Sequence, residues 1–99
     1  MKLTYCAIPR EQFSYRFMIS RWVLGRGEVP LNPFMLFDYY LGRDEEDEKV
    51  IDACHQLVEQ SDLVRVFGNR DKDGVKEEID IARVKGIPVK FHDVSELTR

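Results

Sequence analysis

The sequence SDLVRVFG at residues 61–68, together with DGVKEEIDIARVKGIPVKF at residues 73–91, decides the fold. The first segment holds a short apolar run that stops at a glycine, which is typical of a buried strand. In the second segment, apolar positions recur at helical spacing up to Gly86, and an apolar run with Pro88 follows. Strand, helix and strand in this order predict a β-α-β unit with parallel strands.

The remaining chain extends the same alternation of short apolar runs and longer amphipathic segments. An edge position is expected for the second strand, because Pro30 has no N–H to offer a neighbouring strand. Asp73 is expected to be the N-cap of the third helix. The predicted strands cover residues 3–8, 28–31, 63–67 and 87–91, and the predicted helices cover residues 11–24, 50–58 and 75–85.

Right-handed crossovers leave few topologies for these elements. The simplest is an α/β fold: a small doubly wound, Rossmann-like parallel sheet of four strands in the order 2-1-3-4, flanked by three helices. Ligands of such sheets bind beyond the carboxyl ends of the strands, where the strand order reverses. The segments that meet there are residues 9–11, 32–34 and 68–78.

Length and composition set the class of protein. Ninety-nine residues predict one domain spanning residues 1–99, and 43% hydrophobic residues suffice for a core. A net charge of −3 argues against nucleic-acid binding. The sequence has no long apolar segment or signal-like start, so we expect a cytoplasmic protein without membrane contact. Cys6 and Cys54 show no metal-ligand or disulfide spacing, and we expect two reduced core thiols, no metal and no cofactor.

Residues 61–91, with Pro33 after the second strand, resemble the nucleoside 2-deoxyribosyltransferase-like superfamily. The segments AIPR at residues 7–10 and NPFM at residues 32–35 look like a small branch of it. The resemblance covers roughly residues 3 to 91 and implies a nucleoside or nucleotide ligand. It also implies that Glu78, in the context EIDIA, matches the nucleophile that attacks the anomeric carbon.

Glu78 is chemically suited to that role, since a carboxylate can bond to, or stabilise, an oxocarbenium-like sugar. It can equally be an ordinary acidic residue of a helix start, favoured by the helix dipole. Two positions depart from the family pattern. Asp80 stands where relatives have glycine, and Cys54 stands where they have a second carboxylate. His55 is either a replacement acid/base or a solvent-facing histidine.

The other candidate binding residues lie on the segments that meet at the carboxyl ends of the strands. Arginine side chains are candidates for a phosphate, because no glycine between Tyr5 and Leu24 offers a backbone cradle. Aromatic residues of segment 34–40 either stack on a base or pack on the sheet or a dimer interface. The predicted substrate-binding residues are Pro9, Arg10, Arg16, Pro33, Phe34, Asp38, Gly68, Asp73 and Gly74.

Three functions remain open from the sequence. The first is an N-glycosidase or deoxyribosyltransferase that cleaves the N-glycosidic bond of a nucleoside or nucleotide, with Glu78 as nucleophile. The second is a non-catalytic module of the same fold that binds a nucleotide-derived ligand or a protein. The third is an interaction protein that uses the aromatic segment as a dimer interface. A homodimer or higher homo-oligomer is expected, because so short a chain has little left to complete a site.

Overall fold

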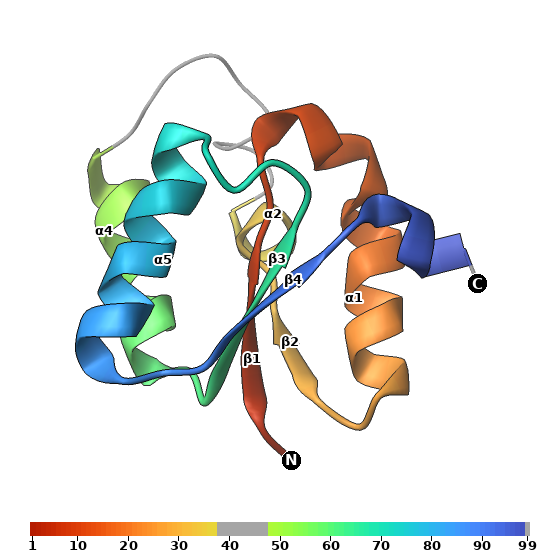
Figure 1. Ribbon diagram of the computed structural model, residues 1–99, viewed down its shortest axis with the longest axis horizontal. Coiled ribbons are helices and arrows are strands. Elements are labelled where there is room, and N and C mark those ends of the chain that lie inside the picture. Colours follow the sequence, from red (N-terminus) through yellow and green to blue (C-terminus); the bar gives the residue numbers. More distant parts are fainter. Residues whose placement is uncertain (38–47, 99) are drawn as a thin grey trace.

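A computed structural model describes residues 1–37 and 48–98, and its central element is a four-stranded parallel sheet (Figure 1). The strand order is β2-β1-β3-β4, which confirms the predicted order 2-1-3-4. The edge position predicted for the strand with Pro30 is also confirmed. The strands are β1 Leu3–Ala7, β2 Val29–Leu31, β3 Leu63–Phe67 and β4 Val89–His92.

Helices cover both faces of this sheet (Figure 1). Helices α4 and α5 pack side by side on one face, and α1 lies on the other face near the C-terminal 3-10 helix η2. Within residues 1–37 and 48–98, no helix combines the length and apolar character needed to cross a membrane. The helices are η1 Arg10–Tyr15, α1 Arg16–Gly25, α2 Pro33–Leu36, α4 Glu48–Gln60, α5 Asp73–Lys85 and η2 Val94–Thr98.

Two details of the sequence prediction are wrong. The N-cap of α5 is Lys72 rather than Asp73, because the Lys76 N–H donates to the Lys72 carbonyl at 2.7 Å and closes the first turn one residue earlier. The predicted helix over residues 11–24 is also not one continuous α-helix, and Met18 within it is 38% exposed. The segment starts as a 3-10 helix and becomes α-helical only at Arg16, which leaves a narrower buried stripe of Ile19 and Val23.

The core has two halves, one on each face of the sheet, because successive side chains of a strand point to opposite faces. Tyr5 and Val64 face α4 and α5, whereas Cys6 and Phe67 face α1. All five residues of β3 are buried. Polar side chains on the central strands therefore need partners within the protein.

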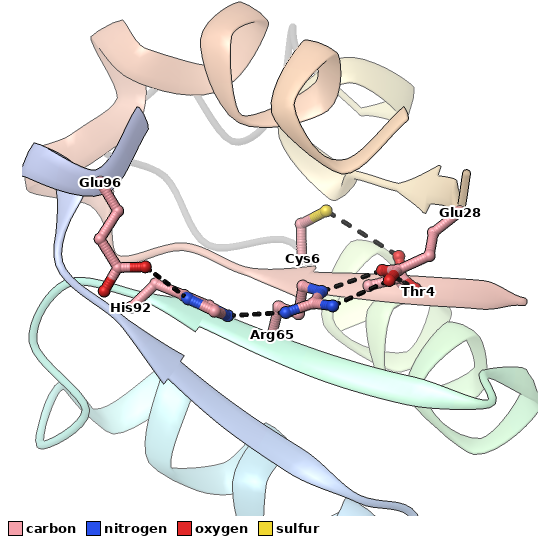
Figure 2. Close-up of polar contacts among 6 residues, drawn as sticks. All are labelled: Thr4, Cys6, Glu28, Arg65, His92 and Glu96. Atoms are coloured by element: carbon pink, nitrogen blue, oxygen red, sulfur yellow. Dashed lines mark hydrogen bonds and ion pairs between the residues drawn. The ribbon is translucent and has the colours of Figure 1, made fainter. Parts of the chain in front are cut away.

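On the α1 face, a chain of hydrogen-bonded polar side chains provides partners for the polar residues of the central strands (Figure 2). Arg65 of β3 is 6% exposed and donates two parallel hydrogen bonds to Glu28, from Nε at 2.9 Å and from Nη2 at 2.8 Å. These bonds hold the pKa of Glu28 down at about 2. Arg65 Nη1 lies 3.0 Å from Nε2 of His92, and Nδ1 of His92 lies 2.9 Å from Glu96. A guanidinium only donates, so Nε2 accepts and Nδ1 donates.

This chain joins three strands and the C-terminal helix. Glu28 also accepts a hydrogen bond of 2.8 Å from the Thr4 hydroxyl of β1. Glu96 belongs to η2, and Trp22 of α1 lies over Arg65 and against the ring of His92. The guanidinium is thus almost fully enclosed, and its bonds to Glu28 and His92 tie β3 to the residue before β2 and to β4. The bond from His92 to Glu96 adds η2.

We predict that Arg65→Met lowers the free energy of unfolding by about 3 kcal/mol, because it leaves the Glu28 carboxylate, whose side chain is 13% exposed, without its partner. Denaturation by urea measures the loss. The control is Lys85→Met, which removes an exposed ion pair of 3.6 Å with Glu59 and should cost less than about 1 kcal/mol. Similar small losses in the two variants would contradict a structural role for the buried pair.

Candidate functional site

Glu78 lies on the second turn of α5, and its half-buried side chain points to the sheet. The hydroxyl of Tyr5, a fully buried residue of β1, donates a hydrogen bond to Oε2 of Glu78. The two residues are 73 positions apart in the sequence. The pairing satisfies the buried phenol, and it orients the carboxyl group that the sequence singled out.

Burial raises the pKa of Glu78 to about 7. The hydrogen bond from Tyr5 lowers this pKa, and the neighbouring charge of Glu77 raises it. A carboxyl group in this range exchanges its proton near neutral pH, which suits a nucleophile or an acid/base group. The pKa of Tyr5 itself is raised well above its ordinary value by burial and by the charge of Glu78, so the phenol keeps its proton.

Cys54 of α4 completes the contact between the helices and β1. Cys54 is 7% exposed and belongs to the same buried cluster as Tyr5. Burial and the charge of Glu78 raise the pKa of Cys54 to about 11. A neutral thiol therefore lies beside the carboxyl group at the position where the sequence pattern placed a second carboxylate. Both cysteines are free and buried, as predicted.

His55 takes part in a separate contact. Its Nε2 lies 3.5 Å from Oε2 of Glu77, and the Glu77 side chain is 63% exposed. Residues 77 and 78 of a helix point in directions roughly 100° apart. The His55–Glu77 pair thus bridges α4 and α5 at the surface, while Glu78 faces Tyr5.

The loops that follow β1 and β3 touch each other where the strand order reverses. Gly68 has a φ of +107°, and a methyl group there would lie 3.2 Å from Cγ of both Pro9 and Gln12. Pro9 is buried and begins η1. The structure brings the predicted residues Pro9 and Gly68 together, and glycine is required at position 68 both for the backbone conformation and for this close approach.

The two predicted phosphate ligands differ in their surroundings. Arg10 is exposed at the start of η1. Arg16 lies folded over the rings of Phe13 and Phe17, at 3.9 and 4.7 Å from their centroids, and its Nη1 donates to the Phe13 carbonyl at 3.1 Å. Arg10 is thus the more accessible of the two guanidinium groups.

The residues after β2 are placed mainly in the core. Asn32 caps α2 by accepting a hydrogen bond from the Phe34 N–H at 3.1 Å, and Pro33 is the buried first residue of that helix. Phe34 is 3% exposed and packs edge-to-face on Phe13, with 5.0 Å between ring centroids. It belongs to the hydrophobic cluster on the α1 face, across the sheet from Glu78.

The other predicted residues lie near the start of α5 or outside the described residues. Gly74 is exposed, with open space around its Cα. The backbone of Asp73 forms the first residue of α5. Asp38 lies outside the residues that the structure describes. Among residues 1–37 and 48–98, no group of three His, Cys, Asp or Glu side chains is arranged to hold a metal ion.

Tyr5 is the member of the site that the sequence interpretation missed. A signal for it was present, because a tyrosine in the middle of a buried strand needs a partner for its hydroxyl. Its partner was not evident from the pattern, since only the packing of α5 on β1 brings Glu78 to it.

Comparisons with known proteins agree with this architecture. Residues 9–92 match the family model described as Domain of unknown function (DUF7768). A solved structure of a 2-deoxyribosyltransferase from the psychrotolerant bacterium Bacillus psychrosaccharolyticus superimposes with a TM-score of 0.70 over 91% of this chain and 71% of that chain. The identity is 18%, so the likeness concerns the fold. No curated protein sequence matches the chain.

We predict that Glu78→Gln stabilises the protein at pH 8 and has little effect at pH 4. The unfolded chain ionises this carboxyl near its ordinary pKa, whereas the folded protein does so at about 7, so ionisation costs stability as pH rises between these values. The gain at pH 8 should be about 3 to 4 kcal/mol, because each unit of pKa difference corresponds to about 1.4 kcal/mol. Thermal unfolding at the two pH values measures it, and an equal shift at both would show that Glu78 titrates normally.

Proposed function

The chain belongs to this family of unknown function, and we propose that the protein binds a nucleoside or nucleotide and cleaves its N-glycosidic bond, with Glu78 as nucleophile. The observation that carries the proposal is the hydrogen bond from buried Tyr5 to Glu78. It holds a carboxyl group with a pKa of about 7 in a defined orientation between α5 and the sheet.

The chemistry follows from what a carboxylate can do at an anomeric carbon. As the base departs, positive charge develops on the sugar, and the carboxylate bonds to C1′ from the opposite side. Water then releases the free sugar, in an N-glycosidase, or a second base accepts it, in a deoxyribosyltransferase. The fold shared with the 2-deoxyribosyltransferase structure supports this class of reaction.

The remaining predicted residues have roles in the same proposal. Arg10, exposed beside the end of β1, is available for a 5′-phosphate. Pro9 and Gly68 lie in contact where the loops after β1 and β3 meet, and exposed Gly74 leaves room for a ligand at the start of α5. We also propose that the protein acts in the cytoplasm as a homo-oligomer, in which a second copy contributes to the binding site.

A second candidate function is a non-catalytic module that binds a nucleotide-derived ligand or a protein partner. Cys54 favours it, because a neutral thiol beside Tyr5 cannot supply the negative charge of a second carboxylate. Melting shifts across a panel of nucleotides, in the absence of any turnover, would support this alternative over the enzyme.

We predict that the wild type releases free base from 2′-deoxynucleosides, their 5′-monophosphates or related N-glycosides, and that Glu78→Gln lowers the rate at least about 1,000-fold. Chromatography of the released base measures the rate. The control is Asp80→Asn, which removes an exposed carboxylate from the same helix and should keep the activity of the wild type. Equal rates for wild type and Glu78→Gln would exclude Glu78 as the nucleophile.

We predict that Tyr5→Phe moves the pH dependence of kcat/KM to higher pH. In the wild type the rate should rise with the ionisation of Glu78, around pH 7. Loss of the hydrogen bond to the ionised carboxylate should shift the midpoint upward by about one to two pH units. An unchanged midpoint, with kcat merely reduced, would mean that Tyr5 has only a packing role.

A further inference from the structure

Both ring nitrogens of His92 are held by the hydrogen-bonded chain on the α1 face (Figure 2). Nε2 lies 3.0 Å from Nη1 of Arg65, and Nδ1 lies 2.9 Å from Oε2 of Glu96. Because the guanidinium only donates, Nε2 must offer its lone pair and Nδ1 must carry the proton. The arrangement therefore requires a neutral imidazole in a single tautomer.

This imidazole connects η2 to the sheet. His92 is the last residue of β4, and Glu96 belongs to η2. Leu97 of the same helix packs against the hydrophobic cluster on the α1 face, and Trp22 packs against both this cluster and the His92 ring. The helix η2 is therefore attached by a polar contact through His92 and by an apolar contact through Leu97.

A second proton on the ring is incompatible with this arrangement. A proton on Nε2 removes the lone pair that Arg65 uses and leaves two cations 3.0 Å apart. The side chains of Arg65 and His92 are only 7% and 11% exposed, so solvent screens their repulsion weakly. The N–H of Nδ1, in contrast, keeps its bond to Glu96, which becomes an ion pair. Protonation thus makes the contact with the sheet repulsive while it strengthens the contact with η2.

Positive charge surrounds His92 on the side of the sheet and α1. Lys90, two residues earlier on β4, points to the same face of the sheet and is exposed. Arg26 of α1 lies 3.8 Å from the centroid of the indole ring that contacts His92. The carboxylate of Glu28 on this side is already paired with Arg65 through two hydrogen bonds. The sheet side therefore repels a protonated imidazole.

Negative charge lies on the side of η2. Glu96 accepts the hydrogen bond from Nδ1 of His92. Asp93, which connects β4 to η2, accepts a hydrogen bond of 3.0 Å from the Ser95 N–H. The His92 carbonyl accepts a hydrogen bond of 3.1 Å from the Gly68 N–H, so the end of β4 stays in place while the ring turns. A protonated ring is thus drawn toward η2 and away from Arg65.

We propose that the protonation state of His92 controls the attachment of η2: the neutral ring holds this helix on the α1 face of the sheet, and uptake of one proton from solvent at Nε2 releases it. The release uncovers apolar surface of Trp22 and of the cluster beneath Leu97. This contact lies across the sheet from Glu78, so the inference does not depend on the proposed N-glycosidase function.

NMR at pH 8 and pH 5 tests the inference, because histidine side chains commonly take up a proton within this range. The parent protein carries Glu78→Gln, so that ionisation of Glu78 does not contribute. Imidazole nitrogen-15 shifts report the protonation of His92, and cross-peaks from the Leu97 methyl groups report contact with the cluster. We expect the Nδ1–H tautomer with η2 attached at pH 8. At pH 5 we expect a protonated ring and a shift of at least about tenfold toward the released helix.

Histidine variants of this parent separate His92 from other titrating groups. His92→Gln keeps a polar side chain but has no titrating ring. The emission maximum of Trp22, the single tryptophan, should then be the same at both pH values. His55→Gln removes the only other histidine and should keep the red shift of the parent between pH 8 and pH 5.

Glu96→Ala tests the same contact without titration. It removes the connection between the ring and η2, so we expect the emission of Trp22 at pH 8 to match that of the parent at pH 5. Its matched control is Glu59→Ala, which removes an exposed carboxylate paired with Lys85 and should behave as the parent.

Two results would overturn the inference. One is an η2 that stays attached at pH 5, whether His92 has taken up a proton or has remained neutral. The other is a His92→Gln variant with the pH dependence of the parent. If His92→Gln does not fold, the NMR comparison of the parent at the two pH values decides alone.

Discussion

The central strands are covered on both faces, and this constraint governs the polar chemistry of the molecule. A polar group on β1 or β3 has no access to water, so it must find a partner within the protein. On the α1 face, Arg65 meets the requirement through Glu28 and His92. On the α4 and α5 face, Tyr5 meets it through Glu78. The contacts of Arg65 hold strands and the C-terminal helix in place, and the contact of Tyr5 holds a carboxyl group that titrates near neutral pH.

The two buried contacts shift the pKa of their glutamates in opposite directions. Glu28 is stabilised as a carboxylate by two direct hydrogen bonds from a guanidinium, and its pKa falls to about 2. Glu78 receives one hydrogen bond from a neutral phenol, which does not offset its burial, and its pKa rises to about 7. The same residue type is therefore held as a carboxylate on one face and titrates near neutral pH on the other. Such a raised pKa costs stability at neutral pH, which is a common property of functional sites.

Much of the fold follows from local patterns in the sequence. The strand at residues 63–67 and the glycine that ends α5 at position 86 have the predicted bounds, since an apolar run and a left-handed C-cap are local features. The edge position of β2 was predicted from Pro30, because the missing N–H of proline is also a local feature. The N-cap of α5 was predicted at Asp73 but lies at Lys72, one residue earlier. The backbone at either position can begin the helix, so the residue types alone do not decide which carbonyl accepts the first helical hydrogen bond.

The partners within the site could not be read from sequence. Glu78 was identified from its motif, but Tyr5 lies 73 residues away and Arg65 lies 37 residues from Glu28. The packing of α5 on β1 brings Glu78 to Tyr5, and the position of β2 at the edge of the sheet brings Glu28 to Arg65. The position of Phe34 could not be predicted either, because an aromatic residue after a strand can line a ligand site or pack in the core. Its contact with Phe13 places it in the core.

Direct titration of the Glu78 side chain is the sharpest test of the central claim that Tyr5 and burial prepare this carboxyl group for chemistry. Carbon-13 NMR of the side-chain carboxyl, assigned by comparison with Glu78→Gln, follows its ionisation without any substrate. We predict a midpoint at about pH 7 in the wild type, moving upward in Tyr5→Phe. A midpoint near the ordinary glutamate value of about 4.3 would contradict the account.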